Sequence, residues 1–210
     1  MRTCVVAIVV LWTCLVSVAA DDWPAPSVHV VFSASGERFV RIIPGSSTGD
    51  VIGFSGAPKG PFARGEFYKR DPDRSYRLVA DVVLKNPVGP TDAMLTNAGY
   101  LVTFDNWHNF GYGVVVGIYS PAGALVRGVS LEQLYPADRV SKIPTSVSSR
   151  WWRCAPHGFV DPATQTKIYV PEQFGGMFVF TLNDGSFEYH PGQAKCEPPA
   201  GPFSASWFGR

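Results

Sequence analysis

The sequence predicts an all-β fold built from antiparallel hairpin repeats. Its 210 residues include 21 glycines and 18 prolines, and 13% of them are aromatic, a composition typical of short strands joined by tight turns. No segment of ten or more residues shows a helical period. Short apolar segments bounded by turn residues instead recur along the whole chain, which is typical of strands.

Residues 1–20 are predicted to be a secretory signal peptide. Arg2 supplies a positive start, residues 5–18 are mostly apolar, and small residues lead up to a cleavage site after Ala20. The apolar run is short for a membrane anchor, although a lipid anchor on Cys14 is an alternative. We therefore expect a secreted or periplasmic protein with no membrane span after signal cleavage.

The mature chain is expected to form a single all-β domain over residues 21–197, followed by a C-terminal tail over residues 198–210. Its length allows one domain with a substantial core. Signal cleavage removes one of the 18 basic residues, Arg2, and none of the 17 acidic ones, so 17 of each remain. Because the net charge is then near zero, nothing attracts nucleic acid or an anionic membrane.

Cysteine usage agrees with export. Cys4 and Cys14 leave with the signal peptide, so only Cys154 and Cys196 remain in the mature chain. A disulfide between them is the first expectation in an oxidising compartment, and it would contribute about 4 kcal/mol in the chain-entropy model. Two free thiols or a metal pair are the alternatives, but the spacing has no zinc-site form.

The first part of the domain reads as two hairpins separated by a loop. Residues 27–34 alternate, with His29 in the row of Val31, and turn at Ser35-Gly36 into residues 37–43. Residues 45–65 are rich in glycine and proline and predict a loop with at most a short strand at 50–54. The next hairpin joins residues 66–70 to residues 76–84 through a type I turn.

The second part continues in the same way, apart from a short helical excursion. Hairpins are expected at residues 93–95 with 100–104 and at 114–119 with 124–129. Ser130 followed by Gln133 has the form of a capping box, so one or two short helices are predicted near residues 130–143. Later strands are expected at 147–153, 167–170, 177–182 and 187–190, the last two joined by an Asn-Asp-Gly turn.

Two hairpins of the sequence repeat one pattern. Residues 117–127 align with residues 179–189, and the turn glycines Gly123 and Gly185 fall in register. A recurring unit of strand, glycine turn and strand is typical of a propeller blade, and also of any antiparallel meander. A complete propeller needs at least about four blades of four strands. With about ten to twelve strands expected, the chain predicts an incomplete or compact propeller-like fold, or alternatively a β-sandwich or barrel.

One stretch also resembles a known group of proteins. Gly99-Tyr-Leu-Val-Thr-Phe-Asp-Asn-Trp-His, Gly111-Tyr-Gly, and Ser146-Val-Ser-Ser-Arg-Trp-Trp-Arg are similar to segments of exported bacterial proteins with propeller-like β repeats and no assigned activity. The resemblance covers residues 95–153. It implies a fold and a compartment, and it provides no catalytic residues.

The loop over residues 105–113 is the candidate site. It contains an acid, two amides, an imidazole, aromatic rings and two glycines within nine residues, although a hairpin needs only about two to five residues to turn. One interpretation is a binding loop in which aromatic rings stack on a ligand while polar groups orient it. The other is that the polar groups bond the loop's own backbone. The candidate ligand-binding residues are Asp105, Asn106, Trp107, His108 and Tyr112.

We therefore expect an exported, non-enzymatic module that binds a partner protein or a small ligand through this loop. No catalytic motif of a known class, phosphate-binding loop or calcium loop is present in the sequence, and no cofactor or metal is expected. The alternative is a carbohydrate-active or metal-assisted hydrolase or lyase that uses Asp105 and His108. The other histidines, including His29, are expected to be strand or turn residues.

Overall fold

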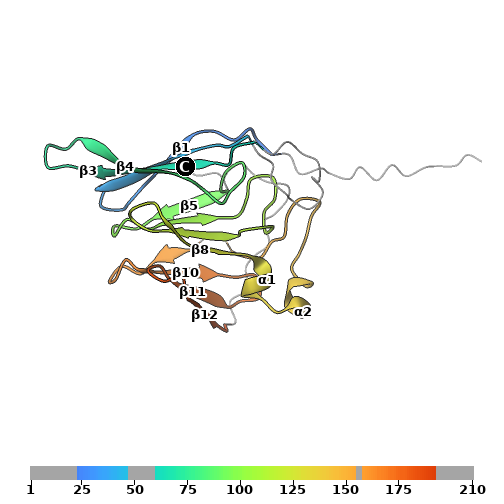
Figure 1. Ribbon diagram of the computed structural model, residues 1–210. Helices are drawn as coiled ribbons and strands as arrows, with labels where there is room; N and C mark the ends of the chain where they lie inside the picture. Colours follow the sequence, from blue (N-terminus) through green and yellow to red (C-terminus); the bar gives the residue numbers. More distant parts are fainter. Residues whose placement is uncertain (1–22, 47–59, 155–157, 193–210) are drawn as a thin grey trace, which may run out of the picture.

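The computed structural model describes residues 23–46, 60–154 and 158–192, which fold into three stacked antiparallel sheets (Figure 1). Each sheet has four strands that follow one another up and down in chain order. The first sheet contains β1 (His29–Phe32), β2 (Arg38–Ile43), β3 (Arg64–Arg70) and β4 (Tyr76–Val83). The second contains β5 (Asp92–Leu95), β6 (Leu101–Phe104), β7 (Val116–Tyr119) and β8 (Leu125–Val129), and the third contains β9 (Phe159–Val160), β10 (Lys167–Pro171), β11 (Met177–Thr181) and β12 (Phe187–His190).

The all-β prediction is confirmed, and so are the hairpins and the short helices. Helices α1 (Leu131–Leu134) and α2 (Ala137–Val140) follow β8, and the predicted capping box is present between Ser130 and Gln133. In the described residues the strands form three separate sheets, which agrees with an incomplete propeller-like arrangement rather than a two-sheet sandwich or a barrel. The predicted strand at residues 50–54 lies outside the described residues.

The strand predicted over residues 147–153 is wrong. This segment makes only single bridges, such as that between Thr145 and Arg150. The reason is that its backbone serves separate loops: the N–H of Arg150 donates to the carbonyl of Phe110, and that of Trp151 to Pro144. The first strand of the third sheet is β9 instead, whose two residues are too few to give a sequence signal.

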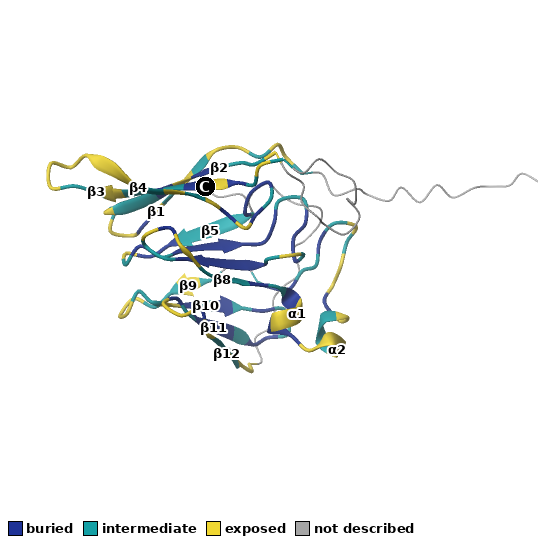
Figure 2. Ribbon diagram, in the orientation of Figure 1, coloured by how far each residue is buried: buried dark blue, intermediate teal, exposed yellow. Residues whose placement is uncertain are grey.

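The second sheet is buried on both faces because it lies between the other two (Figure 2). Leu101 and Tyr119 pack with the first sheet in one hydrophobic cluster. Val102 and Ile118, which alternate with them along β6 and β7, pack with the third sheet in another. All residues of β6 and β7 are consequently buried, as expected when both faces of a sheet are covered.

The repeated hairpins occupy equivalent places in consecutive sheets. The Gly123 turn joins β7 to β8 and the Gly185 turn precedes β12, so each lies between the third and fourth strands of its sheet. Both glycines have positive φ angles, 81° and 72°. A Cβ on Gly123 would lie 2.9 Å from Ala80 of β4, and a Cβ on Gly185 would lie 2.6 Å from the Cβ of Arg127 of β8. Each turn therefore packs on the fourth strand of the preceding sheet, and the sheets repeat as units.

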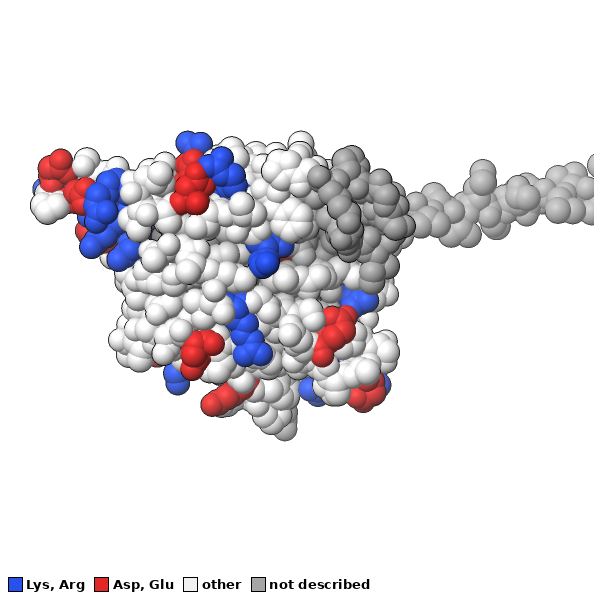
Figure 3. Space-filling model, in the orientation of Figure 1, with Lys and Arg blue, Asp and Glu red and all other residues white. Residues whose placement is uncertain are grey.

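Charged side chains are scattered over the surface. On the face drawn in Figure 3, Lys and Arg alternate with Asp and Glu without an area of a single sign. Several are paired, as Arg41 is with Glu66 at 3.1 Å and Arg64 with Asp81. This distribution agrees with the near-neutral composition. None of the helices in the described part of the chain is both long and apolar enough to cross a membrane.

Candidate functional site

Asp105 lies inside the protein, at the base of the 105–113 loop. Its side chain has no exposed surface. The carboxylate accepts hydrogen bonds from the N–H of Gly111 at 3.0 Å, from Nε1 of Trp152 at 2.8 Å and from Nε of Arg153 at 2.7 Å. Burial raises the pKa of this carboxyl, while Arg153 and the other donors oppose the rise. Asp105 therefore anchors the loop and offers no surface to a ligand.

Asn106 closes the loop from within. Its amide donates to the carbonyl of Tyr112 at 2.6 Å and to that of Val114 at 3.2 Å, and its side-chain oxygen accepts from Nδ2 of Asn86 at 3.0 Å. The side chain is buried. These contacts match the structural interpretation of the loop for Asp105 and Asn106, in which polar side chains satisfy buried backbone groups.

Tyr112 is covered by a cation. The guanidinium of Arg150 lies 4.1 Å from the centroid of its ring, and Arg150 also pairs with Glu132 at 2.9 Å. One face of the Tyr112 ring is therefore occupied by a neighbouring side chain. Such cation–π contacts stabilise the fold by about 0.5–1 kcal/mol at exposed sites.

Trp107 and His108 are half-buried and meet the start of the described chain. Trp23 lies 5.8 Å from the ring of Trp107 and 5.6 Å from that of His108, centroid to centroid. Nε1 of Trp107 donates to the carbonyl of Pro24 at 3.1 Å, and Nε1 of Trp23 donates to Oγ of Ser148 at 3.1 Å. Burial lowers the pKa of His108. Trp23 and Pro24 therefore pack against the outer part of the loop, and we call this contact the clasp.

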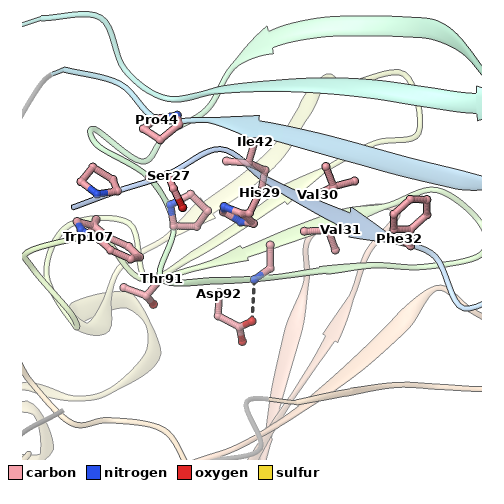
Figure 4. Close-up of a pocket in the computed structure, with 14 residues that line it drawn as sticks. Ser27, His29, Val30, Val31, Phe32, Ile42, Pro44, Thr91, Asp92 and Trp107 are labelled. Atoms are coloured by element: carbon pink, nitrogen blue, oxygen red, sulfur yellow. Dashed lines mark hydrogen bonds between the residues drawn. The ribbon is translucent and has the colours of Figure 1, made fainter. Parts of the chain in front are cut away.

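A pocket of about 460 Å³ lies beside this clasp, between β1 and β5 (Figure 4). These are the first strands of the first and second sheets, and neither pairs with another strand on its second edge among the described residues. Trp107 closes one end, and Phe32 lies toward the other. Of the predicted site residues, only Trp107 lines the pocket.

Two ionisable residues line the pocket: His29 comes from β1, and Asp92 from the start of β5 (Figure 4). The Asp92 carboxylate points away from His29, toward Arg153. Burial lowers the pKa of His29, opposed by a hydrogen bond with the Ser27 backbone and by the charge of Asp92. Burial raises the pKa of Asp92, opposed mainly by Arg153. Oδ1 of Asp92 also accepts from the N–H of Ala93 at 2.9 Å.

Arg153 connects the pocket to the loop anchor. Its Nε bonds Asp105 at 2.7 Å and its Nη1 lies 3.7 Å from Oδ2 of Asp92. The guanidinium is fully buried and lies about 5 Å from the ring centroids of both Phe104 and Phe110. One buried cation therefore meets the carboxylates of both Asp105 and Asp92.

Sequence reasoning did not find His29 or Asp92. The alternation of residues 27–34 places His29 in the same row as Val31, and that row faces the second sheet while Val30 and Phe32 are exposed. The sequence therefore did contain a signal for this residue, namely a polar side chain at an inward-facing position of a strand. Its place in a pocket beside β5 depends on how two sheets stack, and strand periodicity carries no information on that.

No group of three or more His, Cys, Asp or Glu side chains in the described residues could hold a metal ion. Of the predicted disulfide pair, Cys196 lies outside the described residues, as do the signal peptide and the tail. The disulfide therefore stays a prediction.

No family model and no curated protein matches this chain. Among solved structures, it is similar to the crystal structure of Saccharomyces cerevisiae Sqt1, with 11% sequence identity and a TM-score of 0.43. The match covers 83% of this chain and 40% of the Sqt1 chain. At this level the likeness carries no argument on family or function.

Proposed function

We propose that this protein is an exported binding module that holds a small ligand in the pocket between β1 and β5. The observation that carries the proposal is a cavity of about 460 Å³ with the loop residue Trp107 in its wall. Ligand sites typically measure about 300–1,000 Å³ and combine apolar walls with a few polar groups. Here valine, isoleucine, alanine, proline and the aromatic residues Phe32 and Trp107 make up most of the lining residues, and His29, Ser27 and Thr91 supply polar groups.

The proposed ligand site is the pocket, whereas the sequence predicted that the 105–113 loop itself would be the site. Trp107 keeps a binding role, His108 supports it through their shared neighbour Trp23, and Asp105 and Asn106 are assigned to holding the loop. A hydrolase or lyase using Asp105 with His108 gains no support, because the Asp105 carboxylate is fully buried among its donors.

Export is part of the proposal, on the basis of the signal sequence over residues 1–20. Cleavage after Ala20 makes Trp23 the third residue of the mature chain, so processing would produce an N-terminus just ahead of the residues that clasp the loop. The intact mass of the exported protein tests this step. We expect a chain that begins at Asp21, and a mass that retains residues 1–20 would contradict it.

A thermal-shift screen of small molecules tests the binding function. We expect ligands that raise the melting temperature of the wild-type protein and not that of Trp107→Ala. Phe159→Ala is the matched control, because Phe159 is a half-exposed aromatic residue of the third sheet that does not line the pocket. Ligands that stabilise Trp107→Ala as much as Phe159→Ala would place binding elsewhere and overturn the proposal.

A further inference from the structure

β1 forms a wall of the pocket through its backbone edge. All four of its residues, His29 to Phe32, line the pocket (Figure 4). Alternate residues of a strand point to opposite faces of the sheet. Here Val31 packs inward with the second sheet, whereas Val30 and Phe32 are 45% and 56% exposed on the other face. Because residues of both faces line the pocket, the pocket runs along the edge between them.

The hydrogen-bond register leaves backbone groups of β1 available at this edge. The N–H of Ser33 donates to the carbonyl of Arg38 at 3.0 Å, so Val31, two residues earlier in the same regular register, also bonds β2. The N–H and carbonyl groups of Val30 and Phe32 alternate with these and point away from β2. Among the described residues, no strand pairs with them.

The other sheet edges in the described part of the chain are protected against strand pairing. Proteins commonly protect such edges with bulges, charges or short strands. The pairings of β4 and β8 are irregular, β9 has two residues, and β12 carries Glu188 and His190. At β5, across the pocket, the Asp92 carboxylate already accepts a hydrogen bond from the N–H of Ala93. β1 has a regular register and the sequence His-Val-Val-Phe, so its edge is open to another strand.

The pocket has the dimensions of one added strand. It follows β1 from Ser27 to Phe32, about 16–17 Å at ~3.3 Å per residue, which is the length of about six extended residues. β5 forms the opposite wall and Trp107 closes one end. The space therefore suits a single strand, whereas the edge of a second folded sheet would bring further strands against β5.

The chemistry of the walls selects an uncharged peptide. Among the described residues that line the pocket there is no Lys or Arg, and the one carboxylate, on Asp92, points away toward Arg153. A charged side chain would lose its hydration there without gaining a partner, which is unfavourable. Val30, Val31 and Ile42 instead supply apolar surface, which suits the β-branched side chains that are common in strands.

We propose that the pocket binds a short, uncharged peptide in an extended conformation, which adds to the four-stranded first sheet as a fifth strand beside β1. The peptide backbone bonds the N–H and carbonyl groups of Val30 and Phe32, and its side chains continue the rows of β1. This inference rests on the proposed function, since it names the ligand class of the same site.

Isothermal titration calorimetry of the mature full chain tests the peptide class. The probe is acetyl-Thr-Val-Thr-Val-Thr-Val-amide, and a second probe carries an N-methyl group on every residue, so its side chains are the same but its backbone donors are missing. We expect the first probe to bind at least about tenfold more tightly, because an added strand depends on several backbone hydrogen bonds. Equal affinities would overturn the inference.

Val30→Pro tests the position of the peptide. Proline removes the N–H of residue 30 at the free edge, and edge strands tolerate proline at such positions. Val83→Pro is the matched control: the N–H of Leu84 donates to the carbonyl of Ala63, so the N–H of Val83 points to the free edge of β4, away from the pocket. We expect Val30→Pro to lower the peptide affinity at least about tenfold and Val83→Pro to leave it unchanged.

The outcomes separate the peptide inference from the proposed function. Unchanged affinity in Val30→Pro, or an equal loss in both proline variants, overturns the inference. Circular dichroism shows whether Val30→Pro is folded, and if it is not, the methylated probe decides alone. A wild-type dimer that Val30→Pro converts to a monomer, measured by light scattering, would assign the edge to a second copy and also overturn it. If no peptide binds, the peptide inference is wrong, and the thermal-shift screen with Trp107→Ala decides the proposed function on its own.

Discussion

Arg153 donates from Nε to Oδ2 of Asp105 over 2.7 Å, and neither side chain has any exposed surface. Asp105 belongs to the loop after the second strand of the second sheet. Arg153 forms a bridge to Glu172 in the connection between β10 and β11. This ion pair therefore fastens the candidate site to the core between two sheets.

We expect Asp105→Asn to destabilise the protein by about 1.5–3 kcal/mol, because the buried Arg153 guanidinium loses a charge-assisted hydrogen bond and keeps only the more distant carboxylate of Asp92, at 3.7 Å. Urea denaturation measures the free energy of unfolding. Asp138→Asn, at an exposed acid, is the control and should change it by less than about 0.5 kcal/mol. Equal effects of the two substitutions would show that the pair does not hold the loop.

Trp23→Ala should loosen the loop without unfolding the sheets. The substitution removes the ring contacts to Trp107 and His108, each worth about 0.5–1.5 kcal/mol beyond the area buried. Hydrogen exchange is the measurement, and we expect faster exchange at residues 107–112 with unchanged protection in β6 and β7. Unchanged exchange at Trp107 and His108 would contradict a clasp.

Substitution of the repeat glycines, Gly123 and Gly185, should destabilise the protein more than substitution of Gly36, a third glycine with a positive φ angle. Gly36 has a φ of 70°, and a Cβ there would meet nothing within 4 Å, so Gly36→Ala reports backbone strain alone, about 1–2 kcal/mol. We expect Gly123→Ala and Gly185→Ala to cost more, because each added methyl also meets the preceding sheet. Thermal unfolding provides the comparison. Equal losses at the three positions would show that the turns do not pack between sheets.

Stability should fall as the pH drops below about 6.5, the ordinary pKa of histidine. Burial lowers the pKa of His29 and His108 in the folded state, so the unfolded chain takes up protons that the folded chain refuses. This stabilisation is complete above about pH 6.5 and is lost as the pH falls through the lowered values.

The double variant His29→Gln, His108→Gln should flatten that part of the stability curve, measured by urea denaturation between pH 7.5 and 5. Asp92 and Asp105, whose pKa values are raised, act in the opposite direction at more acidic pH and remain in both proteins. If the free energy of unfolding falls equally with pH in the variant and in the wild-type protein, the two histidines do not contribute to the pH dependence.

The predicted disulfide has a direct test. Mass spectrometry of the exported protein under non-reducing conditions, after alkylation, should find no free thiol at Cys154 or Cys196. Removing the disulfide by Cys154→Ser should lower the free energy of unfolding by about 2–5 kcal/mol. Two alkylated cysteines in the native protein would contradict the pairing.

Local patterns determined much of this protein. Alternation, turn glycines and a capping box are properties of neighbouring residues, so they predicted the hairpins around Gly36, Gly123 and Gly185 and the start of α1. They failed at residues 147–153, where Trp152 and Arg153 follow an apolar and aromatic pattern that resembles a strand. Their side chains instead turn inward to Asp105, a partner 47 and 48 residues away.

The candidate site was likewise predicted only in part from local patterns. The sequence by itself determined that the 105–113 loop carries more polar and aromatic groups than a turn requires, and that Trp107 is among them. Only the tertiary structure decided that Asp105 and Asn106 face inward and that Trp107 lines one pocket together with His29. The physical reason is that periodicity records which face of its own sheet a residue occupies, whereas the stacking of sheets decides what that face meets.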